Sequence, residues 1–382
     1  MLFQVETDKA LKLDAEQPSR PSRERPVFIA DDWFDEIVRM IKEYTGDHMA
    51  AVVVDEEVAR LYPERLQALY DAVPRMRTIK FKGGESAKTL ERYAELQGFL
   101  LEQEVHRDDS LISIGGGTFC DLVGFVAATF ARGVSWISIP TTFIAQFDCA
   151  LGGKTAVNVQ GYKNYCGTFY WPNVVFVDRS FLRTLPDRYF RMGIPELAKL
   201  AMIGDEQLFR ELCEATAGGR GVDGLRDNLE DFMVRAMKVK LSVSTRDPFQ
   251  RALRVVLLAG HTTAHALEGA SRLHLHHGEA VAIGLAFESF IAVKQGLLDA
   301  DDRVALIDLL ENCQLPTVLP AELHDRVVVE HMRLEKRNRG RMLSLVLPYK
   351  PGQAVDDWPA SRVMMPPDDL WGELTAYRLT CG

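Results

Sequence analysis

Residues 110–130 read SLISIGGGTFCDLVGFVAATF, an apolar run that ends in three glycines and continues as a helix pattern. Glycines at the end of a strand let the backbone approach a pyrophosphate, and the N-terminus of the next helix favours the negative charge. Cys120 stands where the third glycine of the usual dinucleotide fingerprint would fall. The stretch therefore predicts a strand–turn–helix unit whose turn either binds a phosphate or is a plain tight turn.

The same order of patterns recurs on both sides of this stretch. Strand patterns occupy residues 49–55, 77–84, 135–142 and 173–178, and helix patterns follow the first two at residues 56–73 and 87–105. Such alternation is typical of an α/β layer with a mostly parallel sheet. We expect an α/β domain over residues 25–185, an all-α domain over residues 186–382, and a loosely ordered extension over residues 1–24.

The amino-acid composition limits which partners the protein can bind and in which cell compartment it can be expected. The chain has 382 residues, a net charge of -9 and 47% hydrophobic residues, a balance that argues against nucleic acid or an anionic membrane as a generic partner. It contains no apolar run of roughly 18 residues that would span a bilayer and no apolar segment typical of a signal peptide. Six cysteines without a CxxC pair favour a reduced compartment. We predict a cytoplasmic protein.

Two further turns at strand ends carry polar residues. The segment KGGESAK places Glu85 and Lys88 after one strand, and IPTT places Thr141 and Thr142 after another. Ligands in open α/β sheets bind at the carboxyl ends of the strands. Glu85 suits ribose hydroxyls and Lys88 suits a phosphate, so the three turns together predict a nucleotide site.

A basic, glycine-rich segment follows in this acidic protein. Residues 150–172 contain Lys154, Asn158, Lys163 and Asn164 with little acidic charge. Ammonium groups balance a phosphate and amides orient it. The segment predicts a pocket for a phosphorylated small molecule, although lysines on a surface loop are often only solvated.

Histidines and one glutamate suggest a metal site in the second half. Glu196 follows a proline at the start of a helix pattern, and residues 261–277 contain five histidines. Catalytic zinc sites take three such protein ligands and keep one open position. His261 and His265 share a helical face if the helix covers both, and either His276 or His277 completes a set; spacing alone does not choose between them.

Several segments together resemble the 3-dehydroquinate synthase family of sugar phosphate cyclases. They are GGGTFCDLVGFVAATFARG, IPTTFIAQFDCALGGKTAVN, GYKNYCGTFYWP, TLPDRYFRMGIPELAK and GHTTAHALE with HHGEAVAIG. The resemblance runs from about residue 50 to 350. It implies an N-terminal α/β NAD-binding domain, a C-terminal helical domain with a divalent metal, zinc or cobalt, an active site between them, and a homodimer.

The resemblance also assigns residues by position. The implied metal ligands are Glu196, His261 and His277. NAD+ contacts are implied for Asp55, Glu85, Lys88, Gly115, Gly116, Gly117, Asp121, Thr141, Thr142, Lys163 and Thr184. Substrate contacts are implied for Asp148, Lys154, Asn164, Lys199, Lys240, Arg254, His265, Arg132 from a neighbouring subunit, and Lys336, beside the equally basic Arg337.

The family reaction closes a carbocycle without net oxidation. NAD+ transiently oxidises a secondary alcohol of a heptulosonate 7-phosphate, phosphate is eliminated, the ketone is reduced again, and an intramolecular aldol closes the ring. In the shikimate pathway this step supplies aromatic amino acid biosynthesis. His265 and Lys199 are expected to donate hydrogen bonds or transfer protons.

One position departs from the family pattern. Leu258 stands three residues before His261, where dehydroquinate synthases carry an asparagine. A leucine cannot replace the hydrogen bonds of that amide, so the exact sugar phosphate is in question. Alternatives are a related cyclase of the 2-deoxy-scyllo-inosose synthase or sedoheptulose 7-phosphate cyclase type in secondary metabolism, a metal-dependent polyol dehydrogenase, and a non-catalytic nucleotide-binding protein.

Overall fold

The computed structural model describes residues 5–6, 10–14, 24–73, 75–160, 162–271, 275–334 and 342–381. The chain forms two compact units, residues 1–186 and residues 187–382. Each unit is described below by itself.

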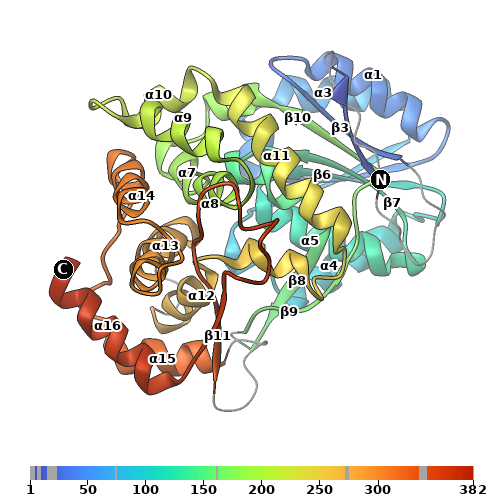
Figure 1. Ribbon diagram of the computed structural model, residues 1–382. Coiled ribbons are helices and arrows are strands. Elements are labelled where there is room, and N and C mark those ends of the chain that lie inside the picture. The colour runs from blue at the N-terminus through green and yellow to red at the C-terminus, as the bar shows by residue number, and fades with distance from the viewer. Residues whose placement is uncertain are drawn as a thin grey trace. The chain divides into compact units, whose positions relative to one another are not determined.

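The first unit is built on an eight-stranded sheet. Its strand order is β1-β2-β3-β10-β7-β6-β4-β5, and the six strands from β3 to β5 are parallel. Figure 1 labels β3, β10, β7 and β6 of this sheet. The strands are β1 (Val5–Glu6), β2 (Ala10–Asp14), β3 (Glu24–Ala30), β4 (Ala50–Asp55), β5 (Met76–Phe81), β6 (Ser110–Gly115), β7 (Ser135–Pro140) and β10 (Val174–Asp178). The predicted parallel α/β unit is confirmed.

Helices cover both faces of the sheet, which is why the central strands read as unbroken apolar runs. One face packs on α1 (Phe34–Thr45) and α3 (Pro63–Ala72), and the other on α4 (Leu90–Glu102) and α5 (Gly117–Thr129). The helix pattern at residues 56–73 forms two helices, α2 (Glu56–Leu61) and α3, because Pro63 lacks the N–H that a continuous helix needs and instead starts the second one.

Parallel strands bring the predicted turns to one edge of the sheet. Gly115 at the end of β6 pairs in register with Pro140 at the end of β7, and Asp55 ends the neighbouring β4. The turns after β4, β5, β6 and β7 therefore begin at the same carboxyl edge. Short 3-10 turns η1 (Glu85–Ala87), η2 (Phe130–Arg132), η3 (Cys149–Leu151) and η4 (Arg179–Arg183) and helix α6 (Phe143–Phe147) complete this unit.

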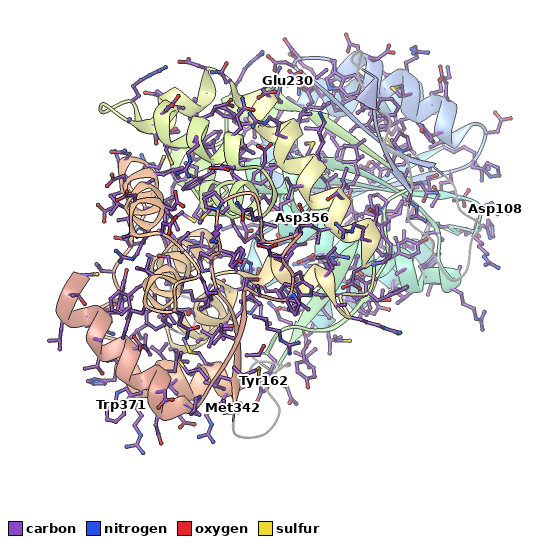
Figure 2. The ribbon with its side chains drawn as sticks, viewed as in Figure 1. Asp108, Tyr162, Glu230, Met342, Asp356 and Trp371 are labelled. Atoms are coloured by element: carbon purple, nitrogen blue, oxygen red, sulfur yellow. The ribbon has the colours of Figure 1, made fainter. Side chains whose placement is uncertain are left out.

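The basic segment forms a separate hairpin of β8 (Lys154–Val159) and β9 (Tyr162–Phe169). Strand β8 packs on α5. Gly167 permits the pairing, because a Cβ there would lie 2.1 Å from the Thr155 carbonyl oxygen. Tyr162, labelled in Figure 2, begins β9 and is 49% exposed.

The second unit is mainly helical, as expected. Its helices are α7 (Asp187–Arg191), α8 (Ile194–Gly204), α9 (Glu206–Thr216), α10 (Gly221–Arg226), α11 (Leu229–Arg246), α12 (His261–Ala270), α13 (His277–Lys294), α14 (Ala300–Asn312), α15 (Asp325–Arg333) and α16 (Pro367–Cys381), with the 3-10 turn η5 (Leu253–Leu258). It differs from a purely helical domain by one antiparallel pair, β11 (Leu343–Val346) and β12 (Arg362–Met365).

Two remaining expectations concern the N-terminus and membranes. Within residues 1–24, expected to be a loose extension, residues 5–6 and 10–14 form β1 and β2, which extend the sheet: β2 pairs antiparallel with β3, and β1 pairs antiparallel with β2. Among the described residues, no helix combines the length and the apolar character needed to cross a bilayer.

Candidate active site

Three helices of the second unit each carry one residue of a Glu–His–His cluster in their first turn. Glu196 lies in the first turn of α8, His261 is the first residue of α12, and His277 is the first residue of α13. One potential ligand atom from each lies within 4.8 Å of the others. The structure thus places His277, and not His276, in the cluster; His276 is the N-cap of α13.

The side chains are oriented for a shared cation. Glu196 Oε1 lies 3.1 Å from His261 Nε2 and 3.3 Å from His277 Nε2. The opposite ring nitrogens face acceptors, because His261 Nδ1 lies 3.1 Å from the Ala259 carbonyl oxygen and His277 Nδ1 lies 3.2 Å from Glu268 Oε1. Both ring nitrogens of each histidine thus face an acceptor, and a cation bound to the two Nε2 atoms would leave the proton of each ring on Nδ1. Lone pairs that face a carboxylate oxygen repel it, and a cation at their centre removes that repulsion.

The protonation states suit metal binding. Burial favours the neutral form of Glu196, but Lys199 and His261 outweigh it and hold the pKa of this carboxyl well below its usual range. Burial and then Lys199 lower the pKa of His261 to about 4. At neutral pH the cluster therefore offers a carboxylate and a neutral imidazole, the forms that bind a divalent ion.

His261 should make the metal-free protein sensitive to acid. Its folded-state pKa lies below the unfolded value, so the unfolded chain binds the proton first and stability falls as pH drops from 6.5 to about 4. The shift corresponds to about 3 kcal/mol of unfolding free energy. Urea unfolding at several pH values should show this loss, and His261→Gln should remove it. Parallel pH profiles for both proteins would contradict the assignment.

Three cationic side chains implied for the substrate are buried in the same unit. Lys199, Lys240 and Arg254 are 2%, 6% and 0% exposed, although such side chains are rarely buried without partners. Lys199 pairs with Glu196 Oε2, and Arg254 donates from Nη1 to the Pro248 carbonyl oxygen at 2.8 Å. Their elements α8, α11 and η5 pack on one another.

His265 lies beside the cluster without belonging to it. Its ring centroid is 5.5 Å from that of His261, and it is half-buried. Among the described residues only Glu196, His261 and His277 meet the geometry of a metal group. The pair His261/His265, one helical turn apart, is therefore not a metal site by itself.

In the first unit, Lys88 is the centre of a polar network at the carboxyl edge. Its side chain is 2% exposed, and its ammonium group donates to Asp121 Oδ2 and to Asn164 Oδ1. Asn158 donates to Glu85 Oε1 at 2.8 Å and accepts the backbone N–H of Asn164 at 2.9 Å. Burial raises the pKa of Asp121 although Lys88 opposes the shift. The network joins the predicted nucleotide residues to Asn164, which the resemblance implies for the substrate; Lys163 Nζ lies 3.9 Å from Glu85 Oε1.

The glycine turn faces the threonines of the next strand end. A Cβ at Gly116 would lie 2.9 Å from Thr142 Cγ2, and one at Gly115 would lie 2.5 Å from Phe119. Thr142 Oγ1 is buried and has no hydrogen-bond partner among the described residues. The bare backbone of Gly116 beside an unused hydroxyl fits a bound phosphate group, since buried hydroxyls are otherwise paired. The Thr141 backbone N–H donates to the Gly115 carbonyl oxygen at 2.9 Å.

Other predicted residues lie apart from this network. Asp55 caps α2 by accepting the Glu57 N–H at 2.8 Å and also accepts the Gly83 N–H at 3.0 Å, so it shapes two turns. Thr184 Oγ1 lies 2.7 Å from the Tyr62 hydroxyl. The remaining three are Arg132, exposed and with a φ of 62°, and the half-buried Asp148 and Lys154. Lys336 and Arg337 lie outside the described residues.

Two functional candidates were missed by reasoning from the sequence. Glu268 and Glu288 are 2% and 0% exposed and contact the cluster or its helix. The sequence contains a feature that could have pointed to each of these two glutamates. Glu268 follows His261 by seven residues on one helical face, and Glu288 is an acidic residue inside an apolar helix pattern, where a carboxylate requires buried partners.

Solved structures share this combination of a parallel α/β unit and a helical unit. One is "ValA (2-epi-5-epi-valiolone synthase)" from Streptomyces hygroscopicus subsp. jinggangensis 5008 with NAD+ and Zn2+ bound, with a TM-score of 0.81, 24% identity, and coverage of 95% of this chain and 99% of that one. Another is 2-deoxy-scyllo-inosose synthase complexed with carbaglucose-6-phosphate, NAD+ and Co2+, with a TM-score of 0.81, 22% identity, and coverage of 96% and 99%. The chain thus shares the fold of these two enzymes.

The family follows from the sequence comparisons. Residues 78–192 match the family description "3-dehydroquinate synthase N-terminal", and residues 193–338 match "3-dehydroquinate synthase C-terminal". The 3-dehydroquinate synthase of Streptococcus equi subsp. equi (strain 4047) is 36% identical over 86% of this chain and 89% of its own length. That of Pseudoalteromonas translucida (strain TAC 125) is 34% identical over 88% and 94%. The chain belongs to the 3-dehydroquinate synthase family, as its motifs indicated.

Proposed function

We propose that the protein is a sugar phosphate cyclase that converts a heptulosonate 7-phosphate into a carbocycle by the 3-dehydroquinate synthase reaction. The Glu196–His261–His277 cluster in a unit that also buries three cationic side chains carries this proposal. A polyol dehydrogenase has no need for these cations, although a probable glycerol dehydrogenase from Sinorhizobium meliloti 1021 shares the fold with a TM-score of 0.61 at 16% identity. The reaction transfers a hydride out and back, releases inorganic phosphate and leaves no net oxidation.

In the second unit, Glu196, His261 and His277 would hold a divalent metal, Zn2+ or Co2+. When bound, the ion supplies Lewis-acid polarisation of an alcohol or ketone oxygen. Lys199 adds positive charge beside the cluster, and His265 is placed to donate or accept a proton next to it. Lys240 and Arg254 have the charge needed to bind the carboxylate of the substrate.

In the first unit, the carboxyl edge of the sheet would hold NAD+, the hydride carrier. We assign to NAD+ the residues that the structure brings to this edge and those that the resemblance adds: Asp55, Glu85, Lys88, Gly115, Gly116, Gly117, Asp121, Thr141, Thr142, Lys163 and Thr184. The observation that supports the site is the unused Thr142 hydroxyl opposite Gly116. Asp148, Lys154, Asn164, Arg132 and Lys336 are proposed to bind substrate.

A panel of sugar phosphates tests the substrate class. Metal-loaded protein with NAD+ should release inorganic phosphate from 3-deoxy-arabino-heptulosonate 7-phosphate and not from glucose 6-phosphate or sedoheptulose 7-phosphate, because Lys240 and Arg254 select a carboxylate. Release from either neutral sugar phosphate alone would favour a cyclase of secondary metabolism instead.

Leu258 should limit the rate with the heptulosonate. It is 6% exposed and ends η5, three residues before His261, where the family pattern has asparagine. An unpaired polar group costs on the order of 1–3 kcal/mol, so Leu258→Asn should raise kcat/KM about tenfold. Leu258→Ala, which opens space without adding an amide, should not. Equal kcat/KM for wild type and Leu258→Asn would show that this position does not touch the substrate.

Two properties rest on the resemblance alone. We infer a homodimer, in which Arg132 of one subunit reaches the phosphate in the other, and a cytoplasmic location in the shikimate pathway. The exposed position of Arg132 is consistent with the first. Sedimentation velocity on the full chain measures the subunit number directly.

A further inference from the structure

The two helices that begin with cluster histidines also carry buried glutamates further along. Helix α12 starts at His261 and contains Glu268, and helix α13 starts at His277 and contains Glu288. Both glutamates are nine-tenths buried or more, with 2% and 0% exposure. A buried carboxylate is costly unless it is well paired, so its position needs a physical reason.

Glu268 of α12 holds the histidine of α13. Its Oε1 accepts a hydrogen bond from His277 Nδ1 at 3.2 Å. The contact favours the ring tautomer with the proton on Nδ1 and turns Nε2 toward Glu196, 3.3 Å away. A carboxylate on the far nitrogen also makes the near nitrogen a stronger donor to a cation.

Glu288 of α13 holds the start of α12. Its Oε2 accepts the Gly260 N–H at 2.7 Å, and its Oε1 accepts the Thr263 N–H at 3.1 Å and the Thr263 hydroxyl at 2.8 Å. Gly260 and Thr263 flank His261 at the helix N-terminus, where backbone N–H groups lack partners within the helix. The carboxylate therefore anchors the backbone on both sides of His261.

Helices α12 and α13 lie close enough for each to bond to the start of the other. A Cβ at Gly284 of α13 would lie 2.0 Å from the Gly260 carbonyl oxygen, so a glycine is required there. Gly260 itself has a φ of 77°, a backbone conformation that favours glycine. The first turn of α12 thus rests directly on the backbone of α13, within reach of Glu288.

We propose that Glu268 and Glu288 are positioning residues that fix the two cluster histidines reciprocally, each helix holding the histidine that begins the other. Glu268 orients the ring of His277 through its side chain, and Glu288 orients His261 through the backbone. The inference rests on the proposed function only in that a divalent cation binds the cluster.

The two carboxylates predict different responses to glutamine. In Glu268→Gln the amide oxygen still accepts from His277 Nδ1, so this variant should lose little of its affinity for the metal. In Glu288→Gln one oxygen becomes an NH2 group that must face a backbone N–H. This variant should therefore lose as much metal affinity as a variant that lacks the carboxylate altogether. Partners of metal ligands typically change metal affinity 10–100-fold.

Co2+ titration of the metal-free protein tests the proposal, with the visible absorption of Co2+ as the readout. Glu268→Ala and Glu288→Gln should each weaken Co2+ affinity 10–100-fold and alter the spectrum, and Glu268→Gln should weaken it less than tenfold. Glu373→Gln is the matched control, because Glu373 of α16 accepts from Lys294 Nζ at 2.7 Å, and Lys294 is the last residue of α13, at the opposite end from His277. Its affinity and spectrum should match the wild type.

The outcomes separate the inference from the function. Wild-type protein that binds no Co2+ overturns the proposed metal function. Wild-type binding together with equal affinity and spectrum in Glu268→Ala and Glu288→Gln overturns the positioning role. Long-range 1H–15N spectra of metal-free Glu268→Gln and Glu268→Ala give a second readout, in which only the alanine variant should lose the Nδ1–H tautomer of His277. An unchanged tautomer in Glu268→Ala contradicts the role of Glu268 even if Glu288→Gln fails to fold.

Discussion

Replacing His277 with alanine lowers the affinity for Zn2+ or Co2+ by about 100-fold or more, since even partners of metal ligands account for 10–100-fold. The variant loses one of three ligand atoms that lie within 4.8 Å of one another. Phosphate release from the sugar phosphate should fall with it, because the ion polarises the reacting oxygen. Isothermal titration with Zn2+ measures the affinity, and metal analysis of the purified protein gives an independent value.

His276→Ala is the control one residue away. His276 is the N-cap of α13, and its backbone N–H donates to Glu279 Oε2 at 2.9 Å, a bond that alanine keeps. This variant should keep its metal. His265→Ala should keep its metal as well. Metal loss in His276→Ala or His265→Ala, with retention in His277→Ala, would show that the ligand set is wrong.

Lys88→Met should destabilise the first unit and abolish NAD+ binding. Lys88 is 2% exposed and pairs with Asp121, whose side chain is 22% exposed, so removing the ammonium group leaves this carboxylate without its nearest counter-charge. Breaking a fully buried pair costs about 3–5 kcal/mol, and the partial exposure of Asp121 puts the expected loss at about 1–3 kcal/mol. Methionine keeps the volume of the side chain, so the loss reports the charge. Urea unfolding and NAD+ titration measure the two effects.

Lys82→Met is the matched control for the charge change. Lys82 is exposed in the same segment, and its replacement should change the unfolding free energy by less than about 0.5 kcal/mol. If Lys88→Met has the stability and the NAD+ affinity of the wild type, Lys88 does not belong to the nucleotide site.

Much of the fold follows from patterns in the sequence. The apolar runs of β4, β6, β7 and β10 are buried on both faces, and their period and flanking glycines mark them clearly. Because parallel strands end at one edge, the turn residues Glu85, Lys88, Gly116 and Thr142 were predictable as one group. The hairpin of β8 and β9 was not, since its pairing depends on the packing of β8 against α5.

The site was predictable in its residue types but not in its detail. Spacing left His276 and His277 equal, and the difference arises from where α13 begins. The ring of the N-cap His276 lies 6.4 Å from that of Tyr189, and His277, the first helical residue, reaches Glu196. Glu288 lies 28 residues from Gly260 and meets it only because Gly284 lets the two helices touch. Asp55 accepts three backbone hydrogen bonds, and the one from Gly83 across the turn was specified by no sequence pattern.

The central claim is a cyclase that regenerates its NAD+ in every turnover. Metal-loaded protein with NAD+ equimolar to enzyme and a hundredfold excess of 3-deoxy-arabino-heptulosonate 7-phosphate tests it most directly. The account predicts one inorganic phosphate and one carbocycle per substrate consumed, complete conversion, and no accumulation of NADH. A reaction that stops after one equivalent, with all NAD+ reduced and no phosphate released, would identify a dehydrogenase and contradict it.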